Sequence, residues 1–154
     1  MRKQTCRCAQ EVQPIQVGGD CYARIKKILD RGKHPTFIGR NLVKICARNG
    51  GVTLYTFAAE DVAVSIVNPA LNVLLVLNVL PAHRSHGMGA RVLDYLQVNF
   101  ARVIDSAVPW FERQGYVIAG EPNQGKRYIT RVMVKKSLLS LAGRLKDALN
   151  TSRA

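Results

Sequence analysis

One junction constrains the fold of this chain more than any other segment of its sequence. An apolar run over residues 72–80 leads into Pro81 and a turn that carries Gly87 and Gly89, and apolar residues at helical spacing follow. The pattern predicts a buried strand, a glycine-bearing turn and a helix. Such a turn directs backbone N–H groups and the positive end of the helix dipole at one point, which suits the binding of a phosphate.

The spacing of the glycines excludes two common nucleotide-binding loops. The lysine of a Walker loop is absent, and the dinucleotide loop needs a third spaced glycine that Gly87-Met88-Gly89 does not supply. The sequence therefore indicates a different phosphate-bearing cofactor.

Further strands are expected on both sides of this junction. The segments 12–17, 52–58 and 62–67 have strand character. The strand over residues 72–80 is the most apolar, so we expect it to be the most buried.

Two helices are expected between the first two strands. Asp20 is expected to cap a helix that stops at Gly32, and a second helix is expected after Gly39 with Asn49-Gly50 at its end. Asn49-Gly50 also suits a hairpin turn. We favour the helix because three strands follow without it.

Composition places these elements in one strongly basic domain. The chain has 154 residues, 47% of them hydrophobic, with 23 Lys and Arg against 10 Asp and Glu, a net charge of +13. This is enough apolar material for a core and excludes a disordered basic tail. Residues 1–48 carry +8, residues 49–121 carry −2 and residues 122–154 carry +7. A near-neutral middle between basic ends indicates an anionic partner.

Cysteines and apolar runs bear on metal binding and location. The four cysteines are Cys6, Cys8, Cys21 and Cys46, and their spacing is unlike a zinc site, so we expect no metal and reduced thiols. We expect no membrane segment, because no apolar run reaches the ~20 residues that a spanning helix needs. The start of the chain is not apolar, so we expect no secretory signal and a cytoplasmic location.

Two segments resemble a known family. Residues 84–90, Arg-Ser-His-Gly-Met-Gly-Ala, resemble the Arg/Gln-x-x-Gly-x-Gly/Ala motif of the GCN5-related N-acetyltransferase (GNAT) superfamily. In that family the motif follows the fourth strand, which often ends in Val-x-Pro, as residues 79–81 do. Residues 99–104 have the pattern of the next strand, and residues 109–116 resemble the family's later helix, which ends in Phe-Tyr-x-x-x-Gly-Phe.

The resemblance implies a fold and a division of the chain. The fold would be α/β (α+β), with a mixed central sheet that splays between strands 4 and 5 and with flanking helices. The GNAT domain would span residues 1–136, and residues 137–154 would form an extra amphipathic helix and tail. Apolar residues repeat along this last helix, which we expect to dock on the core, to contact a partner or to pair two subunits.

The resemblance also assigns the cofactor, acetyl-CoA, and the residues that hold it. Leu77, Asn78 and Val79 would meet the amides of the pantetheine arm, and the Val79 N–H would polarise the thioester carbonyl. The pyrophosphate would lie in the turn formed by Arg84, Ser85, His86, Gly87, Met88, Gly89 and Ala90.

Two departures from the family pattern leave the general acid unassigned. Phe111 stands where many members carry a Tyr that protonates the departing thiolate, and Ile104 stands where an Asn is frequent. Asp61 is expected near Val79, because neighbouring antiparallel strands place opposite ends together. Asp105 is expected to open onto the same end, and either carboxylate is a candidate for the base that takes the proton from the amine.

The expected acceptor side is cationic. Its candidate residues are Arg24, Lys26, Lys27, Arg31, Lys126 and Arg127. This charge favours an acceptor that is nucleic acid, or a nucleic-acid-associated or acidic protein. The alternative is a non-catalytic adaptor that has kept the fold and binds nucleic acid or protein. Either a monomer or a homodimer fits the sequence.

Overall fold

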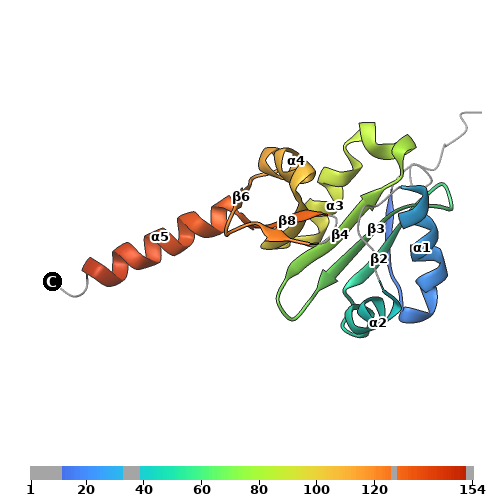
Figure 1. Cartoon of the computed structure of the whole chain (residues 1–154), viewed down its shortest axis with the longest axis horizontal. Helices are drawn as coiled ribbons and strands as arrows, with labels where there is room; N and C mark the ends of the chain where they lie inside the picture. Colours follow the sequence, from blue (N-terminus) through green and yellow to red (C-terminus); the bar gives the residue numbers. More distant parts are fainter. Residues whose placement is uncertain (1–11, 33–38, 126–127, 152–154) are drawn as a thin grey trace, which may run out of the picture. The chain divides into compact units, whose positions relative to one another are not determined.

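The computed structural model describes residues 12–32, 39–125 and 128–151, and the chain forms two compact units, Met1–Leu96 and Gln97–Ala154 (Figure 1). Within the described residues, no helix is long and apolar enough to cross a membrane.

The first unit is built on four antiparallel strands in the order of the sequence. They are β1 (Gln13–Gln16), β2 (Val52–Phe57), β3 (Glu60–Asn68) and β4 (Val73–Val79). The turn between β2 and β3 holds Ala58 and Ala59 at φ of 50° and 64°. Two left-handed residues match the twist of a tight hairpin, although alanine adopts this conformation at a cost.

The most buried of these strands is β3, so the prediction that residues 72–80 would be the most buried is wrong. Six consecutive residues from Val62 to Val67 are buried in β3, whereas β4 alternates between buried and half-buried positions. The β3 run includes Ser65, whose hydroxyl lies 2.8 Å from that of Tyr55. Because this polar group is hydrogen-bonded, it is buried without a large penalty.

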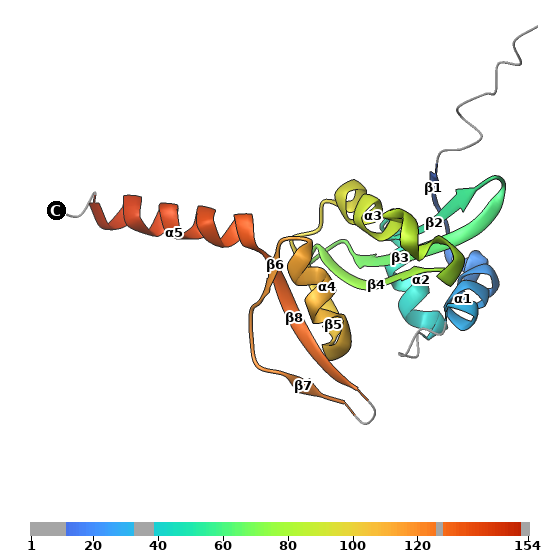
Figure 2. The same ribbon diagram turned by 90° about the horizontal axis from the view of Figure 1, so that it is seen from above.

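Helices cover both faces of this sheet (Figure 2). On one face, α1 (Tyr22–Arg31) and α2 (Arg40–Arg48) share a core with the buried aliphatic residues of β2, β3 and β4. On the other face, α3 (Met88–Leu96) packs on residues that include Tyr55 and Val79. Each predicted helix of this unit is therefore confirmed, and α2 ends at Arg48, directly before Asn49 and Gly50, with Gly50 at φ 73°.

The prediction that Asp20 caps the first helix is wrong. Asp20 lies inside a 3₁₀ turn, η2 (Gly19–Cys21), and α1 begins after Cys21 without a side-chain cap. The end of α1 is as predicted, since the Gly32 N–H donates to the Ile28 carbonyl at 2.8 Å. A second 3₁₀ segment, η3 (Pro81–His86), joins β4 to α3.

The second unit contains the remaining strands and helices. Its strands are β5 (Phe100–Ile104), β6 (Tyr116–Ile118), β7 (Asn123–Gln124) and β8 (Ile129–Lys135), and β8 pairs antiparallel with each of the other three. A short turn, η4 (Asp105–Ala107), leads into α4 (Val108–Arg113), and α5 (Lys136–Thr151) follows β8. The predicted strand over residues 99–104 and the extra helix predicted within residues 137–154 are thus confirmed.

Candidate functional site

Backbone groups at the end of β4 alternate between the two edges of the strand. The Leu80 N–H donates to the Val62 carbonyl at 2.9 Å, and the register with β3 is regular back to Leu77. Bonded and non-bonded pairs alternate in an antiparallel ladder. The backbone of Asn78 is therefore used by β3, whereas the N–H and C=O groups of Leu77 and Val79 point away from β3. Of the three residues expected to meet pantetheine, Leu77 and Val79 are therefore the two whose main-chain groups β3 does not use.

The turn after β4 presents its backbone openly. Gly87 has a φ of 70°, and a Cβ built on it meets nothing within 4 Å. The Arg91 N–H donates to the Gly87 carbonyl at 3.1 Å, which makes Gly87 the residue before the first turn of α3. Helix geometry leaves the N–H groups of Met88, Gly89 and Ala90 without an intrahelical acceptor. These groups and the helix dipole suit an anion.

The Arg84 side chain bonds to two main-chain carbonyls. Its Nε donates to the Val79 carbonyl and its Nη2 to the Gly32 carbonyl, both at 2.8 Å. The guanidinium therefore ties the end of β4 to the end of α1, and these two donor nitrogens are engaged by main-chain carbonyls. The structure does not describe the side chains of Ser85 and His86.

Asn78 lies on the face of β4 that α1 covers. It is 4% exposed, and among the described residues its Nδ2 has no hydrogen-bond partner. A Cβ on Gly32 would lie 2.6 Å from that Nδ2, so only glycine permits this close approach. Sequence reasoning missed this contact because it joins residues far apart in the chain.

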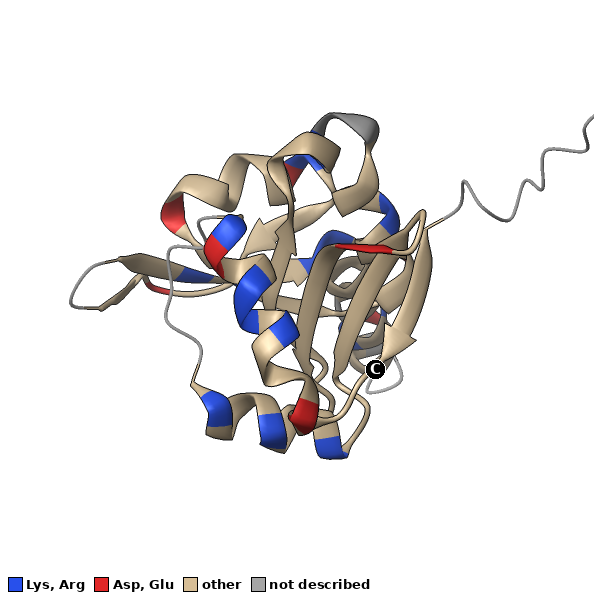
Figure 3. Ribbon diagram, turned by 90° about the vertical axis from the view of Figure 1, so that its right-hand side faces the viewer, with Lys and Arg blue, Asp and Glu red and all other residues tan. Residues whose placement is uncertain are grey.

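Lys and Arg residues, blue in Figure 3, occur along both α1 and α2. Lys26, Lys27 and Arg31 are exposed, as predicted for candidate acceptor-binding residues. The candidate acceptor-binding residues Lys126 and Arg127 lie outside the described residues.

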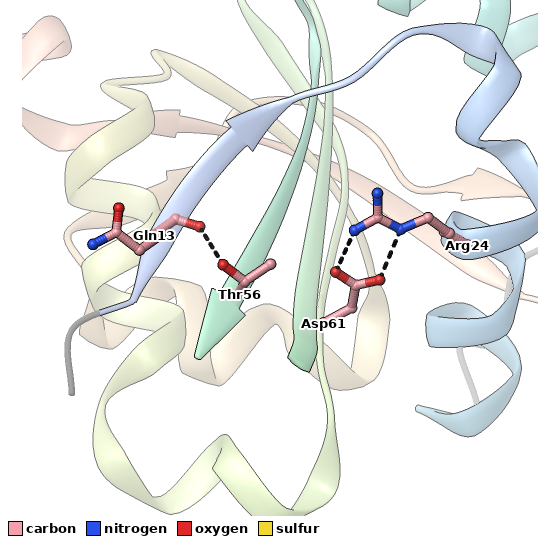
Figure 4. Close-up of polar contacts among 4 residues, drawn as sticks. All are labelled: Gln13, Arg24, Thr56 and Asp61. Atoms are coloured by element: carbon pink, nitrogen blue, oxygen red, sulfur yellow. Dashed lines mark hydrogen bonds and ion pairs between the residues drawn. The ribbon is translucent and has the colours of Figure 1, made fainter. Parts of the chain in front are cut away.

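Arg24 and Asp61 form an ion pair that the sequence did not reveal (Figure 4). The Arg24 Nη2 and Nε donate to the two oxygens of Asp61 at 2.8 and 3.0 Å. These bonds raise the pKa of Arg24. Asp61 lies at the same end of the sheet as Val79, as predicted, because Ala63 pairs with Val79. A candidate base and a candidate acceptor-binding residue are thus partners in one ion pair.

The second unit holds the other candidate base. Asp105 follows β5, and its carboxylate accepts a 3.3 Å bond from the Arg131 Nε, with the Asp105 side chain more than half exposed. Phe111 is buried and packs edge-to-face on Tyr116, which is also buried and donates to the Val98 carbonyl at 2.7 Å. Burial raises the pKa of Tyr116. Both aromatic residues are therefore core residues.

Among solved structures, the chain matches acetyltransferases. A scan against protein-family models and a search of curated sequences find no match. Arabidopsis thaliana Naa50, in complex with the bisubstrate analogue CoA-Ac-MVNAL, matches with a TM-score of 0.62 at 15% identity, over 79% of this chain and 97% of that one. A GNAT-family acetyltransferase from Bacillus cereus ATCC 10987 matches with a TM-score of 0.62 at 16% identity, over 81% and 98%. The ribosomal-protein-S18-alanine N-acetyltransferase from Escherichia coli matches with a TM-score of 0.59 at 17% identity, over 81% and 93%.

The chain has the GNAT fold. The matched share is larger than the unit Met1–Leu96 alone, so the likeness extends over elements of both units. In this GNAT fold, the glycine turn lies between β4 and α3, where the sequence motif predicted it.

Proposed function

We propose that this GNAT-fold chain is an N-acetyltransferase that transfers the acetyl group of acetyl-CoA to an amine. The observation that carries the proposal is the convergence of main-chain donors at the β4–α3 junction. The N–H of Val79 points away from β3, and the first turn of α3 begins directly after the open backbone of Gly87. The matches to acetyltransferase structures support it.

The proposed cofactor site uses the backbone rather than charged side chains. Acetyl-CoA supplies the activated acetyl group and two phosphates that the turn from Arg84 to Ala90 would hold. The Val79 N–H would stabilise negative charge on the thioester oxygen, and one such donor is worth about 3 kcal/mol of the barrier. We propose that this catalytic domain ends at residue 136 and that it acts in the cytoplasm.

Calorimetric titration of acetyl-CoA tests the cofactor site. Asp and Asn have nearly the same shape and both tolerate left-handed backbone. Gly87→Asp should therefore bind at least tenfold more weakly than Gly87→Asn, because it adds a negative charge beside the phosphates. Gly120→Asp is the matched control, since Gly120 is equally open and lies in the other unit. Equal affinities for both Gly87 variants would contradict the proposed site.

Asp105 and Asp61 remain our candidates for the general base. The exposed carboxylate of Asp105 is the stronger one, because both oxygens of Asp61 accept bonds from Arg24. Replacing the true base by Asn should lower the rate by roughly 10²-fold and leave the acetyl-CoA affinity intact. Asp61 is both a candidate base and the ion-pair partner of Arg24. Arg24→Gln separates these two roles, because it removes the ion pair and keeps the Asp61 carboxylate. Wild-type rates in both Asn variants would exclude this mechanism.

The acceptor is proposed to be polyanionic. The exposed Lys26, Lys27 and Arg31 on α1, together with the net charge of +13, support a nucleic acid or a nucleic-acid-associated or acidic protein. Binding to nucleic acid should weaken by roughly 10³-fold as salt rises from about 50 to 200 mM. Replacing the three cations by Gln should flatten this salt dependence without changing acetyl-CoA affinity. If no nucleic acid binds at low salt, an acidic protein becomes the better acceptor.

The rival function is a non-catalytic adaptor. The position of Phe111 in the core favours it, because this residue supplies no proton to a leaving thiolate. Hydrolysis of acetyl-CoA, or acetyl labelling of an acceptor, by the wild-type chain but not by Gly87→Asp would decide for the enzyme.

A further inference from the structure

The last helix carries an apolar stripe that the chain leaves exposed. Leu141, Leu145 and Leu149 are 50%, 58% and 66% exposed, and they recur at the four-residue spacing that places them on one face of α5. Half-buried Leu138 extends the stripe by one turn toward β8. Within the unit Gln97–Ala154, the stripe does not dock on the buried residues. Contiguous exposed apolar surface of this kind marks an interaction site.

Charges on α5 are arranged around the stripe in a specific way. Arg144 and Lys146 directly precede and follow Leu145, so at 3.6 residues per turn they border the stripe on both sides. Asp147, the only acidic residue of α5, is two positions from both Leu145 and Leu149 and so lies on the far face. The charged residues that border the apolar side of the helix are thus both cations.

These charges argue against a second copy as the occupant. Two chains that each carry a net charge of +13 repel one another, and an antiparallel pairing of α5 would bring Arg144 close to its own equivalent. The stripe also contains only Leu side chains, without an aromatic or buried polar group to fix a partner in register. A partner that offers both anionic and apolar groups, and that needs no fixed alignment with the helix, matches this surface better than a protein groove of defined shape does.

We propose that α5 binds in the plane of an anionic lipid surface. The Leu side chains would enter the boundary between headgroups and acyl chains, while Arg144 and Lys146 meet lipid phosphates or carboxylates on either side. The 16 residues of α5 suit this orientation, because they form a short amphipathic helix with low overall hydrophobicity. This inference does not depend on the proposed acetyl transfer, since none of these residues belongs to the proposed cofactor site.

Co-sedimentation of the full chain with vesicles tests the proposal. We expect binding to phosphatidylcholine vesicles with about one third phosphatidylserine in about 0.1 M salt, at least tenfold tighter than to phosphatidylcholine alone. The double variant Leu141→Gln/Leu145→Gln should lose at least tenfold in affinity, and Arg144→Gln/Lys146→Gln should lose the preference for phosphatidylserine. The matched control is Ser140→Gln/Asn150→Gln, which alters the far side of the helix and should bind like wild type.

Three outcomes would overturn the proposal. If the double Leu variant binds vesicles like wild type, the basic chain merely adheres through its charge. If no vesicle binds, the occupant is not lipid. A concentration-dependent dimer in light scattering that disappears in the double Leu variant, without vesicle binding, would assign the stripe to a second copy. Far-ultraviolet circular dichroism of each variant shows that α5 has stayed folded.

Discussion

Replacing Arg84 by Ala tests whether its side chain braces the site. The two hydrogen bonds from the guanidinium to the Val79 and Gly32 carbonyls are both 2.8 Å long, and they join segments 52 residues apart. A hydrogen bond to a charged group contributes about 1.5–3 kcal/mol. Arg84 is exposed, so water replaces part of each interaction and each bond contributes about 1–1.5 kcal/mol, at or below the low end of that range.

We therefore expect Arg84→Ala to lower the free energy of unfolding by about 2–3 kcal/mol. At about 2–4 °C per kcal/mol for a chain of this size, Tm should fall by roughly 5–10 °C. Arg84→Lys keeps the charge but lacks the planar fork that reaches two carbonyls at once, so it should recover about half of the loss.

Urea denaturation followed by circular dichroism measures these differences. Arg91→Ala is the matched control, because it removes an exposed arginine from the same unit. If Arg84→Ala and Arg91→Ala differ by less than about 0.5 kcal/mol, Arg84 is not a brace and its side chain is free to meet the phosphates instead.

Three further predictions concern stability. Burial raises the pKa of Tyr55 to about 12, above its unfolded value of 10.0. The stabilisation of the folded state by the neutral Tyr55 is therefore complete below pH 10 and is lost as the pH rises through 12. The loss amounts to about 2–3 kcal/mol, and alkaline denaturation of Tyr55→Phe should lack this component. Gly32→Ala should destabilise by about 1–3 kcal/mol, because its Cβ would clash with Asn78, and thermal melting against Gly120→Ala measures it. Ala59→Gly should stabilise by about 1 kcal/mol in the same assay, because it relieves a residue at φ 64°.

Local patterns predicted most of the elements of the first unit. The helical periodicity before Gly32 and the glycines at positions 50 and 87 are signals that act within a few residues, and the structure has α1, α2 and the β4–α3 turn where they indicate. The wrong prediction that Asp20 caps α1 also came from a purely local signal. A capping residue is recognised by its type, but η2 precedes α1 and moves the start of the helix to Tyr22.

Side-chain partners were not predictable from the sequence. Arg24 meets Asp61 across 37 residues, and Arg84 meets Gly32 across 52. No local spacing encodes these pairs, because the fold brings the residues together. The misjudged burial of β3 has the same origin: Ser65 lowers the apolar character of the strand, but the Tyr55 hydroxyl satisfies it.

The proposed site is detectable in the sequence for a physical reason. Its working groups are main-chain N–H donors, which every residue except proline possesses, so no catalytic side chain marks them. What the sequence reveals instead is the absence of a side chain where an anion must approach, at Gly87 with its open left-handed backbone. The register of β3 and β4 then decides which donors are available, since a slip by one residue would turn the Val79 N–H toward β3. The chemistry therefore depends on strand register, and Arg84 holds that end of β4 through the carbonyl of the same residue, Val79.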